Sequence, residues 1–446
     1  MNIKQFEDKP LAHYSYAILS GNKIALVDPS RNTTPYYTYA EEHQAEIVAV
    51  FETHPHADFV SSHLQIHSET GAQVFASKLV GADYPHTTFD DGDHFKMGDI
   101  TFSAINTPGH SPDSISIYAT DDKDHHAVFT GDTLFIGDVG RPDLREKAGN
   151  MKAKREELAQ AMYHTMQHKY NHLPDKTLVY PAHGAGSLCG KNMSSDSSST
   201  LGNERVSNWA FKDLTEAEFV KHILSDPPFI PSYFGFDVDI NKNGAEILEK
   251  NLGAIPFLLG VSKLEEDILV VDTRDESKFK KGHLPNAINI MARHENDKIE
   301  TWLGAIVQPK ERFYLVIDSV KNRREILERV AKIGYEQQVK AVLTLSETSK
   351  KASDTLDFDA FKKYPENYTI IDIRNKSEFK DVRFFENALN LPLHELRQRI
   401  AEIPTKKPIV VHCAGGYRSA AGSSIIAKEL KEHTVLDLSD KINEFK

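Results

Sequence analysis

Short apolar runs separated by polar, turn-forming residues dominate the first 185 residues of the chain. A run of four to eight such residues bounded by turn signals is typical of a β-strand. The pattern predicts strands over residues 14–19, 23–27, 45–51, 73–76, 100–105, 114–119, 127–130 and 177–180. Several of these runs end directly before a polar, chemically capable cluster. The pattern therefore predicts stacked β-sheets with helices outside and with function in the loops at strand ends.

Two later segments have helical patterns. Residues 152–169 predict a charged amphipathic helix, and residues 214–224 predict another helix with Thr215 as its N-cap. The serine-rich stretch 194–200 is expected to be an exposed loop. The segment DPPFIPSYFGF that follows is expected to be ordered and to pack on the first domain, with a domain boundary near residue 250.

An internal repeat fills the rest of the chain. ILVVDTRDESKFKKGHLPNAINI, from Ile268, corresponds to YTIIDIRNKSEFKDVRFFENALNL, from Tyr368, and FYLVIDSVKNRREI, from Phe313, corresponds to PIVVHCAGGYRSAA, from Pro408. Strands that alternate with helices in units of about 90 residues predict small parallel α/β domains. The predicted organisation is one large domain over residues 1–250 and two related domains over residues 251–352 and 353–446.

Composition narrows the classes of function. The chain has 446 residues and a net charge of −12, which disfavours binding to a nucleic-acid backbone. Its two cysteines favour a reducing compartment, and we expect the cytoplasm. The first 19 residues do not resemble a signal peptide, and no run reaches the roughly 20 apolar residues of a membrane span. We therefore expect a small-molecule enzyme without a membrane partner.

Histidine and aspartate gather in four clusters, each directly after an apolar run. They are THPHADF over residues 53–59, TPGH ending at His110, FTGD ending at Asp132 and PAHG containing His183. Imidazole and carboxylate groups together suit Fe(II) or Zn(II). A lone histidine is more often a packing residue, and the chain has 21 of them. Four clusters in this arrangement nevertheless predict a metal centre.

In order, these clusters resemble the metal motifs of the metallo-β-lactamase superfamily over roughly residues 1–240. The resemblance implies an αββα sandwich. The family pattern H-x-H-x-D-H is altered here, because Phe59 occupies the last position. In two-metal members such as glyoxalase II, the Asp-His pair serves the second metal. Phenylalanine cannot donate to a metal, so the chain is expected to hold a single ion.

Within the superfamily, the chain resembles the persulfide dioxygenases, which implies one Fe(II) per chain. Matched motif by motif, the iron ligands are His54, His110 and Asp132, a set that leaves positions open for substrate sulfur and O2. His56, Asp58 and His183 would then orient ligands or water. His63 matches no family position and is expected to be a surface or packing residue.

Two further elements resemble this branch. GRPD places Arg141 and Asp143 near the site, where Arg141 could bind a substrate carboxylate, brace a metal ligand or form a salt bridge with Asp143. GAGSLCGK resembles a loop of dioxygenases that are fused to rhodaneses. Its Cys189 either relays sulfur, with Lys191 favouring the thiolate, or packs within a glycine-rich loop.

A second chemical motif lies in the last domain, where the loop CAGGYR, residues 413–418, links a predicted strand to a predicted helix. Glycines let several N–H groups turn towards one sulfur, and the helix N-terminus adds positive potential. Both features stabilise a thiolate or a persulfide. The loop resembles the rhodanese active loop, with Cys413 as nucleophile and Arg418 as a positive charge for an anionic sulfur donor. Its C-x4-R spacing is shorter than the C-x5-R of phosphatases.

The first of the two small domains has lost this chemistry. Asp318 aligns with Cys413 and Arg323 with Arg418, and a carboxylate cannot form a persulfide. This domain is expected to be an inactive spacer or docking platform. The last domain departs from the family elsewhere, because it lacks the Gly-His element that the first unit retains in KKGHLPN.

Together these motifs resemble fusions of a persulfide dioxygenase with rhodaneses. The resemblance implies oxidation of a low-molecular-weight thiol persulfide by O2 to sulfite, with sulfur transfer that yields thiosulfate in sulfide detoxification. One alternative is a glyoxalase II-type zinc thioester hydrolase fused to a sulfurtransferase. Another is a redox or sulfur sensor with a structural metal. A homo-oligomer is a reasonable expectation because of the extra inert domain.

Overall fold

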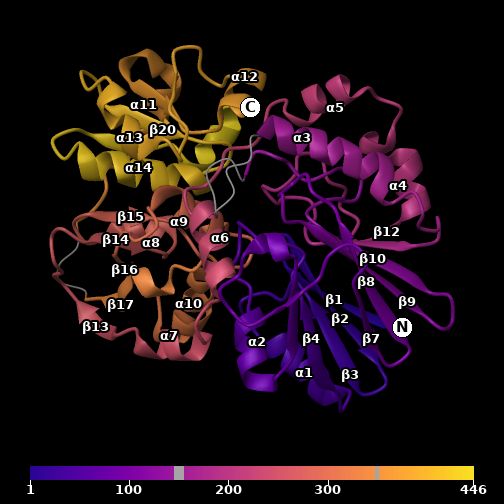
Figure 1. Cartoon of the computed structure of the whole chain (residues 1–446). Coiled ribbons are helices and arrows are strands. Elements are labelled where there is room, and N and C mark those ends of the chain that lie inside the picture. The colour runs from indigo at the N-terminus through magenta and orange to yellow at the C-terminus, as the bar shows by residue number, and fades with distance from the viewer. Residues whose placement is uncertain (145–154, 347–350) are drawn as a thin grey trace. The chain divides into compact units, whose positions relative to one another are not determined.

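The computed structural model describes residues 1–144, 155–346 and 351–446 (Figure 1). These residues form two compact units. The first comprises residues 1–250 and 331–334, and the second comprises residues 251–330 and 335–446. The helix expected over residues 152–169 starts outside the described residues; from residue 155 the chain is helical.

Two six-stranded sheets form the first unit. One has the order β1-β2-β3-β4-β5-β6 and the other the order β12-β11-β10-β9-β8-β7. The strands of the first sheet are β1 (Asn2–Asp8), β2 (His13–Ser20), β3 (Lys23–Val27), β4 (Glu46–Phe51), β5 (Gln73–Ala76) and β6 (Thr87–Thr88). Those of the second are β7 (His94–Met97), β8 (Ile100–Asn106), β9 (Ile115–Asp121), β10 (His126–Gly131), β11 (Leu178–Pro181) and β12 (Ser199–Thr200).

Alternation along the strands gives each sheet two buried faces. Phe51 and Phe129 belong to the apolar core that the two sheets share. Their neighbours Val50 and Val128 point the other way, into cores that the flanking helices cover. Successive side chains of a strand face opposite sides, so this pattern builds a helix–sheet–sheet–helix sandwich. The expected αββα class is confirmed.

The helices of this unit cover the outer faces of the sheets, except for the last, whose Asn241 donates to His56 O and Phe59 O in the loop after β4, each at 2.8 Å. They are α1 (Thr34–Glu42), α2 (His63–Thr70), α3 (Arg155–His164), α4 (Leu201–Ser207), α5 (Glu216–Ile223) and α6 (Phe234–Asn243). Thr215 caps α5 as predicted, in a capping box with Glu218. The predicted loop over residues 194–200 is partly wrong, because Ser199 and Thr200 pair with β11.

The second unit contains two parallel sheets. The five-stranded sheet has the order β13-β17-β16-β14-β15, and the four-stranded sheet has the order β19-β18-β20-β21. The strands are β13 (Phe257–Val261), β14 (Leu269–Asp272), β15 (Ala287–Asn289), β16 (Phe313–Val316), β17 (Val339–Leu345), β18 (Thr369–Asp372), β19 (Leu389–Asn390), β20 (Ile409–His412) and β21 (Val435–Asp437). The helices are α7 (Leu248–Ala254), α8 (Glu276–Lys281), α9 (Ile299–Ile306), α10 (Arg323–Ala331), α11 (Phe358–Lys363), α12 (Lys376–Asp381), α13 (Leu396–Arg399) and α14 (Tyr417–Glu429).

Matching hydrogen bonds support the internal repeat. Arg274 forms a bidentate contact with Asp272, and Arg374 forms the same contact with Asp372. In each domain a corresponding asparagine ties this turn to the neighbouring strand: Asn289 Nδ2 donates to Asp272 O at 2.9 Å, and Asn390 Nδ2 donates to Asp372 O at the same distance. The Asp-x-Arg motif is therefore a structural element and not a catalytic one.

The Gly-His departure in the last domain has a packing explanation. In the first small domain, the ring of His283 stacks on Phe279 with centroids 4.2 Å apart. In the last domain, the guanidinium of Arg383 lies 4.6 Å from the ring of Phe379, at the corresponding place. A cation–π contact therefore replaces the ring–ring contact.

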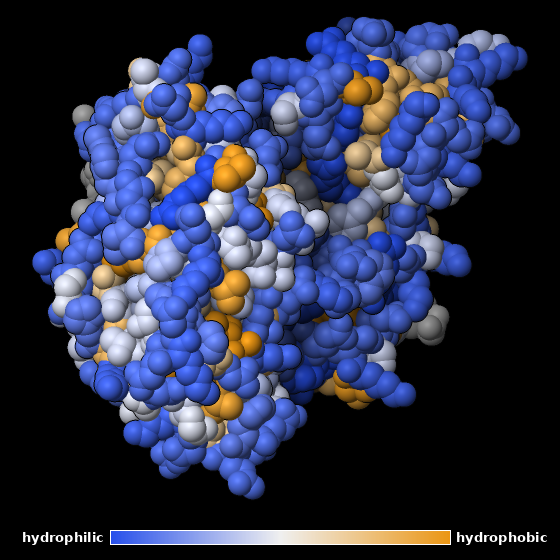
Figure 2. All heavy atoms as spheres, turned by 90° about the vertical axis from the view of Figure 1, so that its right-hand side faces the viewer, coloured by the Kyte–Doolittle hydropathy of each residue, from blue (hydrophilic) through white to orange (hydrophobic). Residues whose placement is uncertain are grey.

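Among the described residues, no helix combines the length and the apolar character that crossing a membrane requires. Figure 2 shows a face on which hydrophilic residues predominate and hydrophobic ones form small separate groups. Scattered exposed apolar residues of this kind are normal on a protein surface.

Candidate metal centre and sulfur-transfer loop

His54 follows β4 and is placed by a buried turn. Asp28, which follows β3, accepts hydrogen bonds from both the backbone N–H and the hydroxyl of Thr53, each at 2.8 Å. The Thr53 hydroxyl also lies 3.1 Å from Nδ1 of His54. Two parallel neighbouring strands thus end in one hydrogen-bonded corner, and this corner turns the imidazole of His54 inward.

Asp132 follows β10 and depends on a glycine. Gly131 has a φ of +53°, in the left-handed region that suits glycine. A Cβ at this position would lie 2.4 Å from the Thr53 hydroxyl oxygen. Any larger residue would therefore both strain the turn and displace the corner that carries His54. The glycine of the FTGD motif brings the two site segments together.

His110 is held in one tautomer by the backbone. Its Nδ1 donates to the carbonyl oxygen of Arg141 at 2.9 Å, which leaves Nε2 to face the site. This is the arrangement by which a second partner orients a metal-binding imidazole. Gly140 makes the approach possible, because a Cβ there would lie 1.8 Å from Asp132 O.

The structure brings the three predicted ligands together. Oδ2 of Asp132 lies 3.7 Å from Nε2 of His54 and 3.6 Å from Nε2 of His110. All three side chains are buried. This carboxylate oxygen accepts no hydrogen bond from any described residue. A buried, unsatisfied carboxylate oxygen beside two imidazole nitrogens is costly by itself, and the donor set fits a divalent metal ion.

His183 connects this triad to a second carboxylate. Its Nδ1 contacts Asp132 Oδ1 at 2.7 Å, and its Nε2 lies 2.9 Å from Asp58 Oδ2. Burial opposes a charge on this imidazole, but Asp132 and Asp58 outweigh burial and raise the pKa of His183 well above its ordinary value. Burial likewise opposes ionisation of Asp132, but His183, followed by His110 and His54, holds the pKa of Asp132 well below its ordinary value. His183 thus holds Asp132 by a hydrogen bond to Oδ1, which leaves Oδ2 to face His54 and His110.

The potential second metal site is altered by Phe59. Donor atoms of His56, Asp58 and His183 lie within 4.8 Å of one another. The ring of Phe59 is next to them, 4.4 Å from the ring of His56. An apolar ring thus fills the position where the family pattern has another histidine, which disfavours a second ion.

Sequence reasoning missed His13, which starts β2. Its ring lies tilted against that of Phe59, with centroids 3.9 Å apart, and is buried beside His183. Burial, followed by the charges of His183 and His56, lowers the pKa of His13 well below its ordinary value, so the ring is neutral. The only signal in the sequence was a polar residue at the start of an apolar strand. His63 was expected to be a surface or a packing residue; it is buried and packs on Tyr84.

Arg141 is a brace. Its Nε and Nη2 donate to the two carboxylate oxygens of Asp143, both at 2.6 Å, and its guanidinium is buried. Its backbone carbonyl accepts from His110 Nδ1, and its backbone N–H donates to Cys189 O at 2.9 Å. The sequence left three roles open for Arg141, and the structure shows two of them: the salt bridge with Asp143 and the support of His110.

Cys189 lies beside the triad, but Lys191 does not assist it. The Cys189 sulfur is within 4.8 Å of donor atoms of Asp132 and His183. Burial, followed by the charges of Asp58 and Asp132, raises the pKa of this thiol well above its ordinary value. The Nζ of Lys191 instead donates to Ile223 O at 2.9 Å, near the end of α5. The expectation that Lys191 favours a Cys189 thiolate is therefore wrong.

Cys413 occupies the predicted loop between β20 and α14. Its sulfur accepts a hydrogen bond from the Gly416 N–H at 3.1 Å. Gly416 has a φ of +101°, and a Cβ there would lie 3.0 Å from Asp440 N. The loop therefore requires glycine at this position. Within the described residues this is the one backbone N–H that contacts the sulfur, fewer than the glycine-rich sequence predicts.

Arg418 carries a compensated charge. Its two terminal nitrogens each donate to Glu378 at 2.7 Å, and its guanidinium lies 5.8 Å from the centroid of the Trp302 ring. Burial opposes the charge, but Glu378 outweighs it and raises the pKa of Arg418. Arg418, expected to offer a positive charge to an anionic sulfur donor, thus forms a bidentate ion pair with Glu378 beside the loop.

In the first rhodanese-like domain, the residue at the position of Glu378 is a lysine, and it pairs with the residue at the position of Cys413. Asp318, at the position of the nucleophile, contacts the Nζ of Lys278 at 2.7 Å, and Lys278 corresponds to Glu378. Arg323, at the position of Arg418, donates to Ile255 O at 2.8 Å. The side chains at the positions of Cys413 and Arg418 thus both form contacts within this domain.

Known protein families match the two compact units separately. Residues 8–183 match the Metallo-beta-lactamase superfamily, and residues 261–343 and 357–446 each match the Rhodanese-like domain. A crystallised metallo-β-lactamase from Staphylococcus aureus subsp. aureus COL is similar, with 28% identity and a TM-score of 0.67 over 77% of this chain and 99% of that one.

Two kinds of curated relative match the first unit about equally well. A hydroxyacylglutathione hydrolase of Tolumonas auensis is 31% identical over 38% of this chain and 61% of its own length. The mitochondrial persulfide dioxygenase ETHE1 of Homo sapiens is 30% identical over 36% of this chain and 59% of its own length. The chain thus spans about three fifths of the length of these relatives.

Proposed function

Because the chain joins a metallo-β-lactamase domain, homologous to persulfide dioxygenases, to rhodanese-like domains, we propose that it oxidises a thiol persulfide and transfers sulfur. The first activity is assigned to residues 1–250 and the second to residues 353–446. Residues 251–352 are assigned to an inactive rhodanese-like domain. Sulfite is the proposed product of oxidation, and thiosulfate is the proposed overall product.

A single observation carries the oxygenase proposal: two imidazoles and one carboxylate converge, while Phe59 takes the place of a second-metal ligand. A two-histidine, one-carboxylate set is the donor set of non-haem Fe(II) oxygenases, whereas paired metals serve hydrolysis. His54, His110 and Asp132 would hold the iron. When bound, the iron would supply adjacent open positions for the persulfide sulfur and dioxygen.

The surrounding residues have defined tasks. The Arg141 carbonyl keeps the His110 proton on Nδ1, and Thr53 positions the His54 ring. His183 holds a proton between Asp132 and Asp58, so that Asp132 keeps its other oxygen directed towards His54 and His110. Phe59 gives the site an apolar wall, which suits an uncharged oxidant such as O2, and the ring of His13 packs behind it.

Sulfur transfer requires one nucleophile. The Cys413 thiolate attacks the outer sulfur of a persulfide, the S–S bond breaks, and the thiol leaves with the proton. Cys413 then carries the outer sulfur as a persulfide near the Gly416 N–H. A sulfite lone pair attacks this sulfur, and the Cys413 thiolate leaves as thiosulfate forms. Atoms and electrons balance without another oxidant.

The second candidate is a zinc thioester hydrolase of the glyoxalase II type. The hydroxyacylglutathione hydrolase relatives favour it, at an identity similar to that of the dioxygenases. Phe59 argues against it, because it removes an imidazole from the position that serves the second metal. The two functions differ in their need for oxygen, which makes them separable by one assay.

Oxygen consumption tests the proposal. Iron-loaded protein is expected to consume O2 when glutathione persulfide is added, with sulfite as product, and to leave S-lactoylglutathione intact. The measurement is an oxygen-electrode trace beside the absorbance of the thioester. Zinc-loaded protein is the control and should do neither. Rapid thioester hydrolysis without oxygen uptake would replace the proposed function by the second candidate.

A further inference from the structure

The turn over residues 437–440, at the end of strand β21, packs against the loop that carries Cys413. Gly416 of this loop donates its N–H to the Cys413 sulfur at 3.1 Å. The backbone of the turn approaches the same glycine so closely that a Cβ on Gly416 would lie 3.0 Å from Asp440 N. A displacement of the turn would therefore let the N–H that contacts the sulfur move.

The backbone of this turn is strained at Ser439. Its φ is +51°, a left-handed conformation that residues other than glycine rarely adopt. Within its own domain, Ser439 N donates to Asp437 Oδ1 at 2.9 Å, which helps to hold this conformation. Strained residues persist only where their surroundings hold them, and they cluster at functional sites. The geometry of the turn thus depends on the partners of its polar groups.

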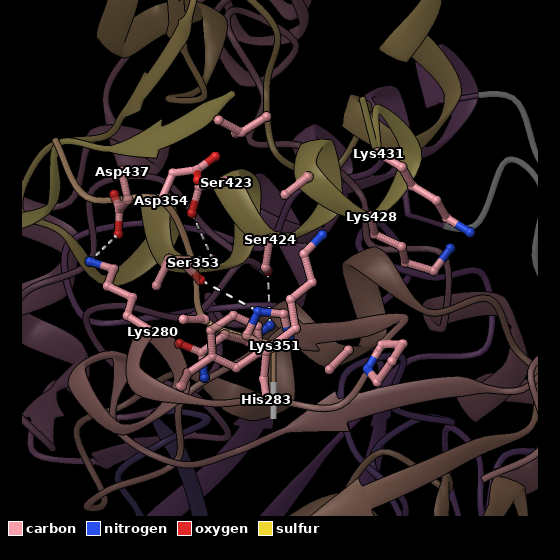
Figure 3. A pocket seen from close by; sticks show the side chains of 18 of the residues that line it. Lys280, His283, Lys351, Ser353, Asp354, Ser423, Ser424, Lys428, Lys431 and Asp437 are labelled. Atoms are coloured by element: carbon pink, nitrogen blue, oxygen red, sulfur yellow. Dashed lines mark hydrogen bonds and ion pairs between the residues drawn. The ribbon is translucent and has the colours of Figure 1, made fainter. Parts of the chain in front are cut away.

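Two further partners of the turn come from helix α8 of the first rhodanese-like domain. The Ser439 hydroxyl donates to Glu276 Oε1 at 2.7 Å, and Lys280 Nζ lies 2.8 Å from Asp437 Oδ2. Figure 3 shows Lys280 extending to Asp437. The side chain of Asp437 is only 3% exposed, so this ion pair is screened less than an exposed one. Two side chains of one helix, which also pair with each other, thus hold the strained turn.

The loop of Cys413 has a direct contact with the same domain. Tyr417, the first residue of helix α14, donates its hydroxyl to Met291 O at 2.8 Å. Burial, followed by the charges of Asp297 and Glu300, raises the pKa of Tyr417 well above its ordinary value, so the hydroxyl keeps its proton and stays a donor. The first rhodanese-like domain therefore holds the loop at two places, through Tyr417 and through the strained turn.

We propose that the first rhodanese-like domain positions the sulfur-transfer loop, and that Glu276 and Lys280 are its positioning residues. Through the strained turn they fix the Gly416 N–H at the sulfur, where this donor stabilises the thiolate and the carried persulfide. A misplacement of about 1 Å can cost a reaction about a hundredfold in rate, so contacts outside the loop can control transfer. The inference rests on the proposed sulfur transfer at Cys413, and it gives the inactive domain a task beyond that of a spacer.

Thiocyanate formation from thiosulfate and cyanide by the full chain tests the proposal. Lys280→Met and Glu276→Ala are each expected to lower kcat by about tenfold or more, because the turn loses a contact that fixes it. The ratio kcat/KM should fall by the same factor, since the loss affects the reaction and not the binding of thiosulfate. Lys280→Arg keeps the cation and should restore most of the rate. Ser439→Ala removes one hydroxyl only and should also lower kcat.

Lys278→Met is the matched control. Lys278 lies on the same helix and is exposed, and its ion pair is with Asp318. The replacement is the same as in Lys280→Met, but kcat should stay at the level of the unmodified chain. All rates are compared below the onset of thermal unfolding of each variant. If Lys280→Met, Glu276→Ala and Ser439→Ala transfer sulfur as fast as this control, or if only KM changes, the proposal is wrong.

Alkylation by iodoacetamide separates this proposal from the proposed function, because it needs no turnover. In full chains that also carry Cys189→Ser, Cys413 is the only cysteine. Lys280→Met should slow the alkylation of Cys413 at fixed pH, because the reacting thiolate loses its fixed N–H donor, whereas Lys278→Met should not. Equal rates in the two variants would overturn the proposal even where thiocyanate forms. Slower alkylation in a chain that forms no thiocyanate would support the positioning role and count against the proposed sulfur transfer alone.

Discussion

Replacing Asp132 with alanine is expected to abolish iron binding and persulfide-dependent oxygen uptake while sulfur transfer continues. Asp132 supplies the only carboxylate of the proposed ligand set, and its other oxygen anchors His183. Loss of a partner that merely supports a ligand typically costs 10–100-fold in metal affinity or activity, so loss of the ligand should cost more than about 100-fold. Iron content and oxygen uptake measure the effect.

The control for this variant is Asp122→Ala. Asp122 is an exposed residue of the same sheet, after β9, and has no place in the site. Thiocyanate formation from thiosulfate and cyanide should stay at the level of the unmodified chain in both variants, which shows that the second unit is intact. Oxygen uptake that persists in the Asp132 variant would remove this carboxylate from the ligand set.

Replacing Cys413 with serine is expected to remove sulfur transfer and to spare oxygen uptake. Serine keeps the size of the side chain, but its oxygen cannot carry a sulfane sulfur. Removing an enzyme's nucleophile commonly costs several orders of magnitude, so thiocyanate formation should fall by about a thousandfold or more. Persulfide-dependent oxygen uptake should be unchanged, because no atom of this loop belongs to the proposed metal site.

Cys189→Ser is the matched control, since Cys189 is the other cysteine of the chain. It should retain thiocyanate formation, because it lies beside Asp132 in the first unit and burial keeps its thiol protonated. If sulfur transfer survives in the Cys413 variant, or disappears in the Cys189 variant, then the assignment of Cys413 as the nucleophile is wrong.

Strands with strong apolar patterns were predictable from sequence. Residues 23–27 and 73–76 are strands as predicted, and the other six predicted strands shift by no more than two residues at either end. Strand β1 was missed because its sequence, NIKQFED, alternates weakly and remains partly exposed. It forms through pairing with β2, a tertiary contact that local pattern does not encode.

Some residues of the candidate site were likewise predictable from the sequence, and others were not. The His/Asp clusters were found because each follows a predicted strand, and the resemblance to persulfide dioxygenases singled out His54, His110 and Asp132 among them as the ligands. His13 and Glu378 were not, since their roles depend on partners far along the chain: Phe59 for His13 and Arg418 for Glu378. Lys191 was misplaced because two residues of separation from Cys189 do not determine where a long side chain points.

Iron content and nitric oxide spectroscopy on protein purified without oxygen test the central claim most directly. A lone ferrous ion held by two imidazoles and one carboxylate keeps positions open for small ligands. We predict about one iron per chain and, after addition of nitric oxide, the S = 3/2 paramagnetic resonance signal of a mononuclear ferrous site. A zinc pair in each chain, with no such signal, would contradict the account.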